Sequence, residues 1–208
     1  MASQMRDDIN SNAGARRTPG RPREFDEVDI LQRLVNLFWD RGYEATSLSD
    51  IVTTTGLKKG SLYSLFGGKH DMYMKSLAHY NREYVQAACK GLTNTASGLP
   101  RERLDVFLSS PIKALSEDND QRGCFLCNSA AEMAKYDSEV RQSVAKAHDD
   151  MLRALEAVLR EESPLQEDEK ISKRARALLV TYTGLRILAR TRPDLEILRD
   201  AKEAALEL

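Results

Sequence analysis

The chain has 208 residues, of which 41% are hydrophobic and 30% are charged, so it is long enough to bury a full core. Its 31 basic residues nearly balance its 32 acidic ones, and the net charge of -1 excludes a general attraction of the whole protein to polyanions. No run of about 18 apolar residues could span a bilayer, and residues 1–10 lack the apolar segment of a signal peptide. We therefore expect a globular, cytoplasmic protein.

Residues 1–24 are basic and contain several glycines and prolines. Arg16, Arg17, Arg21 and Arg23 lie in a stretch, residues 11–23, that has no acidic residue. Because few side chains are apolar, this segment cannot bury enough surface to offset the entropy lost on ordering. We predict a flexible basic arm.

The first helical pattern starts near Asp26. Ile30, Leu34 and Phe38 recur at helical spacing, and Gly42 supplies a stop signal. These residues predict the first helix of a head, residues 25–70.

A second, short helix is expected between Ser47 and Thr55. Ser47 is a good N-cap, and Asp50 stands three residues later, as in a shortened capping box. Gly56 suits a left-handed turn, after which residues 58–66 resume the helical pattern. Two short helices around a glycine turn predict a helix-turn-helix.

Residues 69–92 form a long amphipathic pattern, and residues 93–100 read as a linker. Further helical spacing follows in residues 104–115, 124–133, 140–159 and 171–188. No stretch alternates as a half-buried strand does. We predict an all-α protein, with a three-helix head joined by a long fourth helix to a helical body that spans residues 71–208.

The segment from Lys58 to Ser64 has the composition of a helix that enters the major groove of DNA. Gly60 permits close approach, the serine hydroxyls donate or accept hydrogen bonds, and residues 56–70 carry three lysines and no acidic residue. Lys69 opens the next helix, where free backbone N–H groups favour a phosphate. Two alternatives stay open: Tyr63 as a core tyrosine, and the arm as a solvated tail.

The stretch from Leu37 to Tyr73 resembles the DNA-binding domain of the TetR/AcrR family of transcriptional regulators, through its GYEATS, GLKKGSLY and F-x-x-K elements. The preceding GRPREFD, residues 20–26, resembles the arm and the entry to the first helix in that family. Leu65 departs from the pattern, because many members have a polar residue there. The resemblance implies a homodimeric repressor that a small molecule releases from a pseudo-palindromic operator of double-stranded DNA.

Carried across residue by residue, the resemblance places Thr46 and Ser47 near phosphates, residues 58–61 and Ser64 at the groove, and Tyr63 and Lys69 on the DNA backbone. The expected DNA-binding residues are Arg21, Arg23, Thr46, Ser47, Lys58, Lys59, Gly60, Ser61, Tyr63, Ser64 and Lys69.

The segments RGCFLCNSAAEMA, residues 122–134, and YTGLRILAR, residues 182–190, resemble parts of a subset of the family. Apolar faces on the two C-terminal helices predict a four-helix bundle with a second copy of the chain. The expected dimer residues are Leu178, Tyr182, Gly184, Leu185, Leu188, Leu195, Leu198 and Ala201. The alternative is that both helices pack only within one chain.

Three cysteines in a chain without export signals are expected to be reduced. Cys124 and Cys127 stand three apart, hence on one face of the predicted helix. Three interpretations stay open: a packed apolar face, a thiol sensor for oxidants or electrophiles, and a copper sensor completed by His148 or a methionine. A closed zinc site lacks visible ligands, and no cofactor or resident metal is expected.

A pocket between helices of the body is the expected effector site. The effector or sensor residues that we expect are Phe107, Ile112, Cys124, Phe125, Cys127, Asn128, His148, Met151 and Tyr182. Each of them could instead be a core residue. A ligand that binds the DNA-incompetent form better would shift the population and move the fourth helix.

Two alternatives from other classes remain. A helical enzyme would need a convergent catalytic constellation, and no motif such as H-E-x-x-H or G-x-S-x-G is present, so we expect no enzyme. A helical adaptor without DNA binding would use the same apolar faces. Activation instead of repression also stays open, as do the effector, the operator sequence and the target genes.

Overall fold

The computed structural model describes residues 26–191 and 194–207. Within these ranges every regular element is helical, which confirms the all-α prediction. The elements are α1 (Glu27–Arg41), α2 (Leu48–Thr55), α3 (Lys59–Phe66), α4 (Lys69–Tyr80), η1 (Asn81–Val85), α5 (Gln86–Thr93), η2 (Thr95–Ser97), α6 (Pro100–Ser116), α7 (Phe125–Glu132), α8 (Ser138–Glu162), α9 (Asp168–Leu188), η3 (Ala189–Thr191) and α10 (Leu195–Leu206). The arm, with Arg21 and Arg23, lies outside the described residues.

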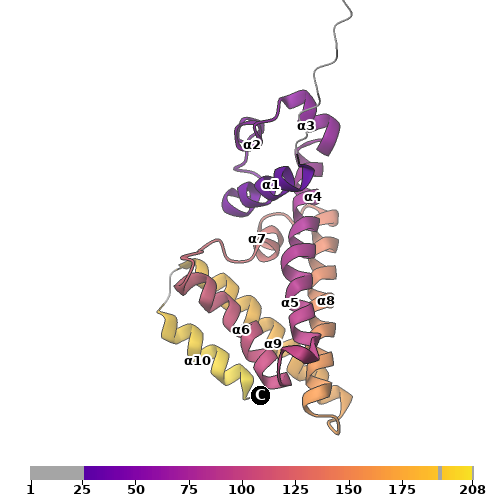
Figure 1. The fold of residues 1–208 in the computed structure, drawn as a ribbon, viewed down its shortest axis with the longest axis vertical. Helices are drawn as coiled ribbons and strands as arrows, with labels where there is room; N and C mark the ends of the chain where they lie inside the picture. Colours follow the sequence, from indigo (N-terminus) through magenta and orange to yellow (C-terminus); the bar gives the residue numbers. More distant parts are fainter. Residues whose placement is uncertain (1–25, 192–193, 208) are drawn as a thin grey trace, which may run out of the picture.

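Helices α1 to α3 form the head at one end of the molecule (Figure 1). Asp26 caps α1 by accepting a hydrogen bond from the N–H of Val28. Ser47 and Asp50 form the expected capping box at α2, and Gly56 ends that helix at φ 70°, in the left-handed region that glycine adopts without strain. Local sequence signals therefore fix both ends of α2.

The expected fourth helix is continuous from residue 69 to residue 93, as α4, η1 and α5. Its middle, Asn81–Val85, is a π-helical segment, an irregularity that local sequence signals do not reveal. Its first part packs against α1, where the rings of Phe38 and Tyr73 meet edge to face at 5.1 Å. Its second part lies beside α8, so one long element passes from the head into the body.

The body consists of α5, α6, α8, α9 and α10, and the short helix α7 lies between it and the head (Figure 1). Buried apolar side chains run without interruption from α1 through α4 to α9, in one core. Burial of this kind supplies most of the stabilisation of a helical domain. Head and body are therefore joined by packing as well as by the chain.

Asp137 joins the two parts by a polar contact as well. It is the N-cap of α8, where Oδ1 accepts from the N–H groups of Glu139 (2.9 Å) and Val140 (3.0 Å), while Oδ2 lies 2.6 Å from Nε2 of His70 on α4. The hydrogen bond from Val140, followed by the one to His70, lowers the pKa of the Asp137 carboxyl.

We expect Asp137→Ala to lower the free energy of unfolding by about 1–2 kcal/mol at neutral pH, because it removes an N-cap and the contact with α4. A carboxyl whose pKa is lower in the folded state stabilises the protein above its unfolded pKa, about 3.9, and this contribution is lost as the pH falls through the folded value. Urea unfolding should therefore show a smaller difference from wild type near pH 3 than near pH 7. Asp149→Ala, at an exposed site in α8, is the control, and an equal loss there would contradict the capping role.

Candidate nucleic-acid interface and its link to the body

Helix α3 separates a basic exposed face from a buried apolar one. Lys58, Lys59, Gly60, Ser61 and Ser64 are exposed, and Tyr63 is 45% exposed. Leu62 and Phe66 are buried in the head. Lys58 at the N-cap makes no side-chain capping bond, and the first turn contains no acidic residue. The exposed face of α3 therefore offers hydrogen-bond donors and positive charge, the groups that DNA backbone and base edges accept.

Tyr63 extends from α3 together with a lysine. Its ring lies 5.8 Å from Nζ of Lys59, one helical turn earlier, so the two side chains occupy one surface patch. The exposure of Tyr63 removes the core-tyrosine alternative. Leu65, which departs from the family pattern, is also exposed, at 44%.

Thr46 does not lie where the resemblance places it. Its side chain is buried, and Oγ1 donates to the carbonyl of Gly42 at 2.6 Å, so its hydroxyl cannot reach a phosphate. The neighbouring Ser47 is exposed, and its hydroxyl donates to Asp50 at 2.6 Å. Only Ser47 of this pair remains accessible to DNA.

Lys69 is half-buried at the first turn of α4, and its Nζ lies 4.3 Å from the centre of the Tyr43 ring. Asp71 already accepts the N–H of Gly68 at 2.7 Å, so a phosphate here would meet a carboxylate as well as the lysine. Lys75, which sequence reasoning missed, is exposed and donates to the carbonyl of Leu65 at 3.1 Å, at the end of α3. In the sequence, the only sign of Lys75 is that it follows Lys69 by nearly two helical turns.

Helix α7 binds the head through Glu132. The two carboxylate oxygens of Glu132 accept the backbone N–H groups of Tyr43 (3.0 Å) and Glu44 (2.8 Å), in the loop between α1 and α2. Gly42 has φ 83°, and a Cβ at this position would lie 2.7 Å from Glu132 Oε2. The glycine expected as a helix stop therefore also leaves room for the Glu132 carboxylate, and no sequence signal pointed to this partner.

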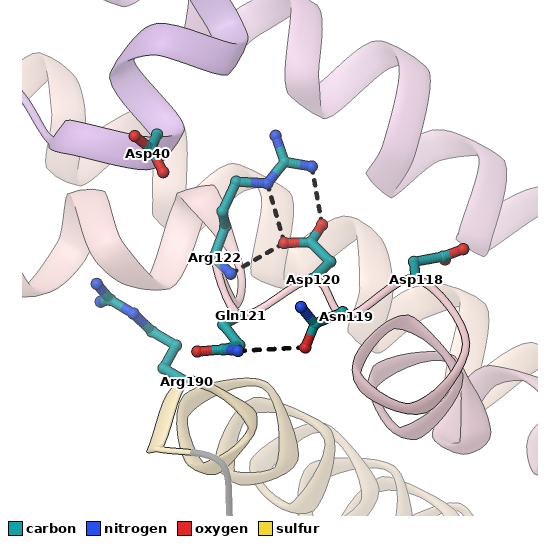
Figure 2. Close-up of a pocket in the computed structure, with 7 residues that line it drawn as sticks. All are labelled: Asp40, Asp118, Asn119, Asp120, Gln121, Arg122 and Arg190. Atoms are coloured by element: carbon teal, nitrogen blue, oxygen red, sulfur yellow. Dashed lines mark hydrogen bonds and ion pairs between the residues drawn. The ribbon is translucent and has the colours of Figure 1, made fainter.

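Arg122 binds the head from the loop that precedes α7. Its guanidinium lies 3.9 Å from the centre of the Trp39 ring, donates to Asn36 at 3.2 Å and is held by Asp120 at 2.8 Å. A polar cavity of about 610 Å³ lies beside it, between Asp40 of α1, residues 118–122 and Arg190, with the Asp120–Arg122 pair on its wall (Figure 2). Charged side chains from head and body thus meet at this junction.

The two cysteines lie close together at the start of α7. Cys124 is the N-cap of α7, with extended backbone dihedral angles, while Cys127 lies inside the first turn. Cys124 is buried, and the hydroxyl of Tyr80 donates to its sulfur at 3.7 Å. The helix begins one residue later than the periodicity predicts.

Around Cys124 the structure brings several expected effector residues together. Tyr80 meets Phe125 edge to face at 5.7 Å, and the rings of Phe107 and Tyr182 stack at 4.1 Å. The guanidinium of Arg186 donates to two neutral groups, the hydroxyls of Tyr182 (2.9 Å) and Ser110 (3.3 Å). Arg186 escaped sequence reasoning because nothing local distinguishes it from a surface arginine.

The other expected effector residues are dispersed. Ile112 and Met151 are buried in the core, and His148 is half-buried, where burial lowers its pKa. Asn128 bonds to the carbonyl of Arg122 and to Arg190. Within residues 26–191 and 194–207, no three His, Cys, Asp or Glu side chains are placed to hold a metal ion.

An apolar cavity of about 260 Å³ does lie between α5 and α6, and Phe107 lines it together with Ala88, Gly91 and Arg103. The Arg103 side chain is buried; it donates to the carbonyl of Leu92 at 2.7 Å and pairs with Glu161 at 2.6 Å. Of the expected effector residues, only Phe107 lines this cavity.

Half of the expected dimer residues lie in the core of the chain itself. Leu178, Tyr182, Leu185 and Leu198 are buried against other helices of the body, so they are not available to a partner. The same helices expose another apolar face, formed by Val180 (71%), Ile187 (52%), Leu188 and Ile197. Gly184 lies on this side, since a Cβ there would meet nothing within 4 Å. Leu195 and Ala201 are partly buried.

A helix-turn-helix head with a basic recognition helix, carried on a helical body, defines a DNA-binding transcriptional regulator. Residues 30–74 match the family model of bacterial regulatory proteins of the tetR family, and residues 100–204 match the LmrA/YxaF-like C-terminal domain of transcriptional regulators. The chain belongs to the TetR family. No helix among its described residues is long and apolar enough to cross a membrane.

Two curated relatives match the chain over nearly its whole length. The chain is 28% identical over 193 residues to the uncharacterised regulator YezE of Bacillus subtilis, covering 91% of this chain and 98% of the relative. It is 28% identical over 204 residues to the repressor ComR of Escherichia coli, with 96% of each covered. Among solved structures, the regulator CifR in complex with 26-bp operator DNA is 27% identical, with a TM-score of 0.78 over 90% of this chain and 98% of CifR. The reduced form of Escherichia coli NemR, 20% identical with a TM-score of 0.74 over 85% of this chain and 95% of that one, shares the fold.

Proposed function

We propose that this protein is a homodimeric repressor that a small effector releases from a pseudo-palindromic operator. The observation that carries the proposal is the basic, acid-free exposed face of α3 from Lys58 to Ser64. Two relatives support it: ComR is a repressor, and CifR was solved on operator DNA. Ser47 and Lys69 would contact phosphates at either side of α3.

Selection of bound fragments from genomic DNA, followed by titration of a labelled site, tests the DNA-binding part. We expect two inverted half-sites about one helical turn, ~34–36 Å, or somewhat more apart. Binding should exceed that to a scrambled site by at least about 10³-fold. Equal affinity for both would favour the alternative from another class, a helical adaptor that does not read DNA.

The dimer that we propose uses the exposed face of α9 and α10, with Val180, Gly184 and Ile187 at successive turns. Introducing Val180→Glu and Ile187→Glu together should turn a dimer into a monomer in sedimentation, because two charges would be buried without partners. Operator affinity should then fall by at least about 100-fold, since one head replaces two. Leu165→Glu, at a fully exposed leucine between α8 and α9, is the control. A wild-type monomer at micromolar concentration would contradict the proposal.

The effector site that we propose is the apolar cavity between α5 and α6. Phe107 connects its wall to Tyr182, and Arg103 supplies a buried polar group, the combination typical of small-molecule sites. Binding here would act on the fourth helix, which continues into the head. A screen of metals, electrophiles and hydrophobic amines for release of the operator tests effector binding.

A thiol response is the second route to release, and the position of Cys124 favours it. A cysteine at a helix N-cap lies at the positive end of the helix dipole, where a thiolate is stabilised. The copper alternative has no comparable support, because the two cysteines have no third His, Cys or acidic ligand beside them among the described residues.

A further inference from the structure

Cys124 and Cys127 begin helix α7 as a Cys-x-x-C pair. Cys124 is the N-cap and Cys127 is the third residue of the helix. Side chains at the N-cap and at the third helical residue meet across the first turn of a helix, and the interaction with Cys127 lowers the pKa of Cys124, so the two thiols lie close together. This is the placement in which a Cys-x-x-C pair exchanges two thiols for a disulfide without moving the backbone far.

The surroundings of the pair make its two thiols different. Hydrogen bonds from the Cys127 thiol and backbone, the charge of Arg186 and the hydroxyl of Tyr80 together lower the pKa of Cys124. Hydrogen bonding to Cys124, together with burial, raises the pKa of Cys127. The charge of Arg186 also acts on the Asp120 carboxyl, so a Cys124 thiolate is one of two anions that this guanidinium stabilises. Cys124 is thus the nucleophile, and Cys127 keeps its proton.

Little of the cysteine pair is exposed to solvent. Cys124 is 6% exposed, and Cys127 is only partly exposed. The third cysteine, Cys89, is buried, and burial raises its pKa to about 11, so it is a poor nucleophile at neutral pH. A small neutral oxidant reaches a sheltered thiolate more easily than a bulky charged disulfide does.

We propose that Cys124 and Cys127 form an oxidation site that takes a small neutral peroxide and closes reversibly to an intramolecular disulfide. This inference rests on the thiol response proposed above and names its reactant and its product. The site is distinct from the apolar cavity, so effector binding and oxidation are separate inputs to one body.

Hydrogen peroxide oxidises the two thiols in two steps. The Cys124 thiolate attacks one oxygen of hydrogen peroxide; the S–O bond forms, the O–O bond breaks, and the released hydroxide takes a proton to become water. The Cys127 thiol then attacks the sulfenic sulfur; the S–S bond forms, the S–O bond breaks, and hydroxide leaves with the thiol proton as a second water. Two thiols are oxidised by two electrons, and one peroxide is reduced to two waters.

Helix α7 gives the reaction a route to the DNA-binding head. The pair lies at its first turn and Glu132 at its last residue, only about 12 Å away at 1.5 Å per residue. Closing the disulfide removes the Cys124 thiolate to which Tyr80 donates and on which the Arg186 charge acts, so the start of α7 is held differently. The end of the same short helix holds the α1–α2 loop.

The test uses the reduced, full-length chain treated with hydrogen peroxide. Free thiols should fall from three to one, with a mass loss of two hydrogens in one tryptic peptide, and dithiothreitol should restore all three. In Cys127→Ser, dimedone should trap a sulfenic acid on Cys124. In Cys89→Ser, the matched control, two thiols should fall to none. Persistence of all three thiols, or a disulfide between two chains, would overturn the site.

Two further measurements complete the test. At equal concentration, hydrogen peroxide should close the disulfide at least about tenfold faster than glutathione disulfide, and equal rates would overturn the assignment to a small neutral oxidant. Oxidation should weaken binding of an operator fragment about tenfold in wild type but not in Cys127→Ser, and equal loss in both would overturn the role of the disulfide. Titration of the never-oxidised protein tests DNA binding separately, so failure of either proposal can be told from failure of the other.

Discussion

Replacing Lys58 and Lys59 by glutamine is expected to lower operator affinity about 10- to 100-fold and to reduce the slope of log affinity against log salt by about 1 to 2. Both side chains are exposed at the start of α3, in a turn without acidic residues. Each lysine that leaves a phosphate returns about one counterion to the DNA, which is why the slope reports the number of contacts. Fluorescence anisotropy over a series of salt concentrations measures both quantities.

A matched control removes the same charge elsewhere. Lys170 and Lys173 are exposed near the start of α9, where they pair with Glu167 and Glu169. Replacing these two lysines by glutamine should leave the salt slope unchanged. If both double variants behave alike, the start of α3 is not at the DNA.

The second large effect is expected from Glu132→Ala. Its carboxylate accepts two backbone N–H groups of the head, and hydrogen bonds to a charged group contribute about 1.5–3 kcal/mol each at most. Without them the head samples more positions relative to the body, so the fraction of molecules whose heads match the operator falls. We expect operator affinity to fall about tenfold.

Hydrogen exchange distinguishes this role from general destabilisation. In Glu132→Ala the amides of Tyr43 and Glu44 should exchange faster, whereas those in the core of α8 should not change. Glu132→Gln, which retains one acceptor, should give an intermediate result. Glu139→Ala, an exposed position at the start of α8, is the control. Unchanged exchange at residues 43 and 44 would contradict the proposed hold on the head.

Local signals predicted the head well because its ends are set by neighbouring residues. Ser47 with Asp50 and Gly56 each act within a few residues of themselves, and all three behave in the structure as expected. The same reasoning separated exposed Lys59 from buried Leu62 on α3, since helical spacing alone assigns faces. The exposed face of α3, which we propose to bind DNA, could therefore be predicted from the sequence as an exposed face.

Tertiary contacts decided the features that local sequence signals could not predict. The family resemblance placed the Thr46 hydroxyl near a phosphate, but this hydroxyl donates to the carbonyl of Gly42 inside the head. Leu178 and Leu185 form an apolar helix face as predicted, but periodicity cannot say whether that face meets another helix of the same chain or a second copy. Cys124 and Arg186 are 62 positions apart, and only folding brings them into one site. Long-range pairs leave no mark in a single sequence.

Gly42 also limits how this regulator could be recombined with its relatives. A Cβ at that position would displace the Glu132 carboxylate, which the amides that follow the glycine need as an acceptor. A hybrid made by grafting residues 1–68 onto a foreign body would therefore keep a properly folded head with two amides left unsatisfied, unless the recipient carries a glutamate at the matching place. The unit to transplant is the head together with α7, although 57 residues lie between Phe66 and Cys124 in the chain and a cut between them looks natural.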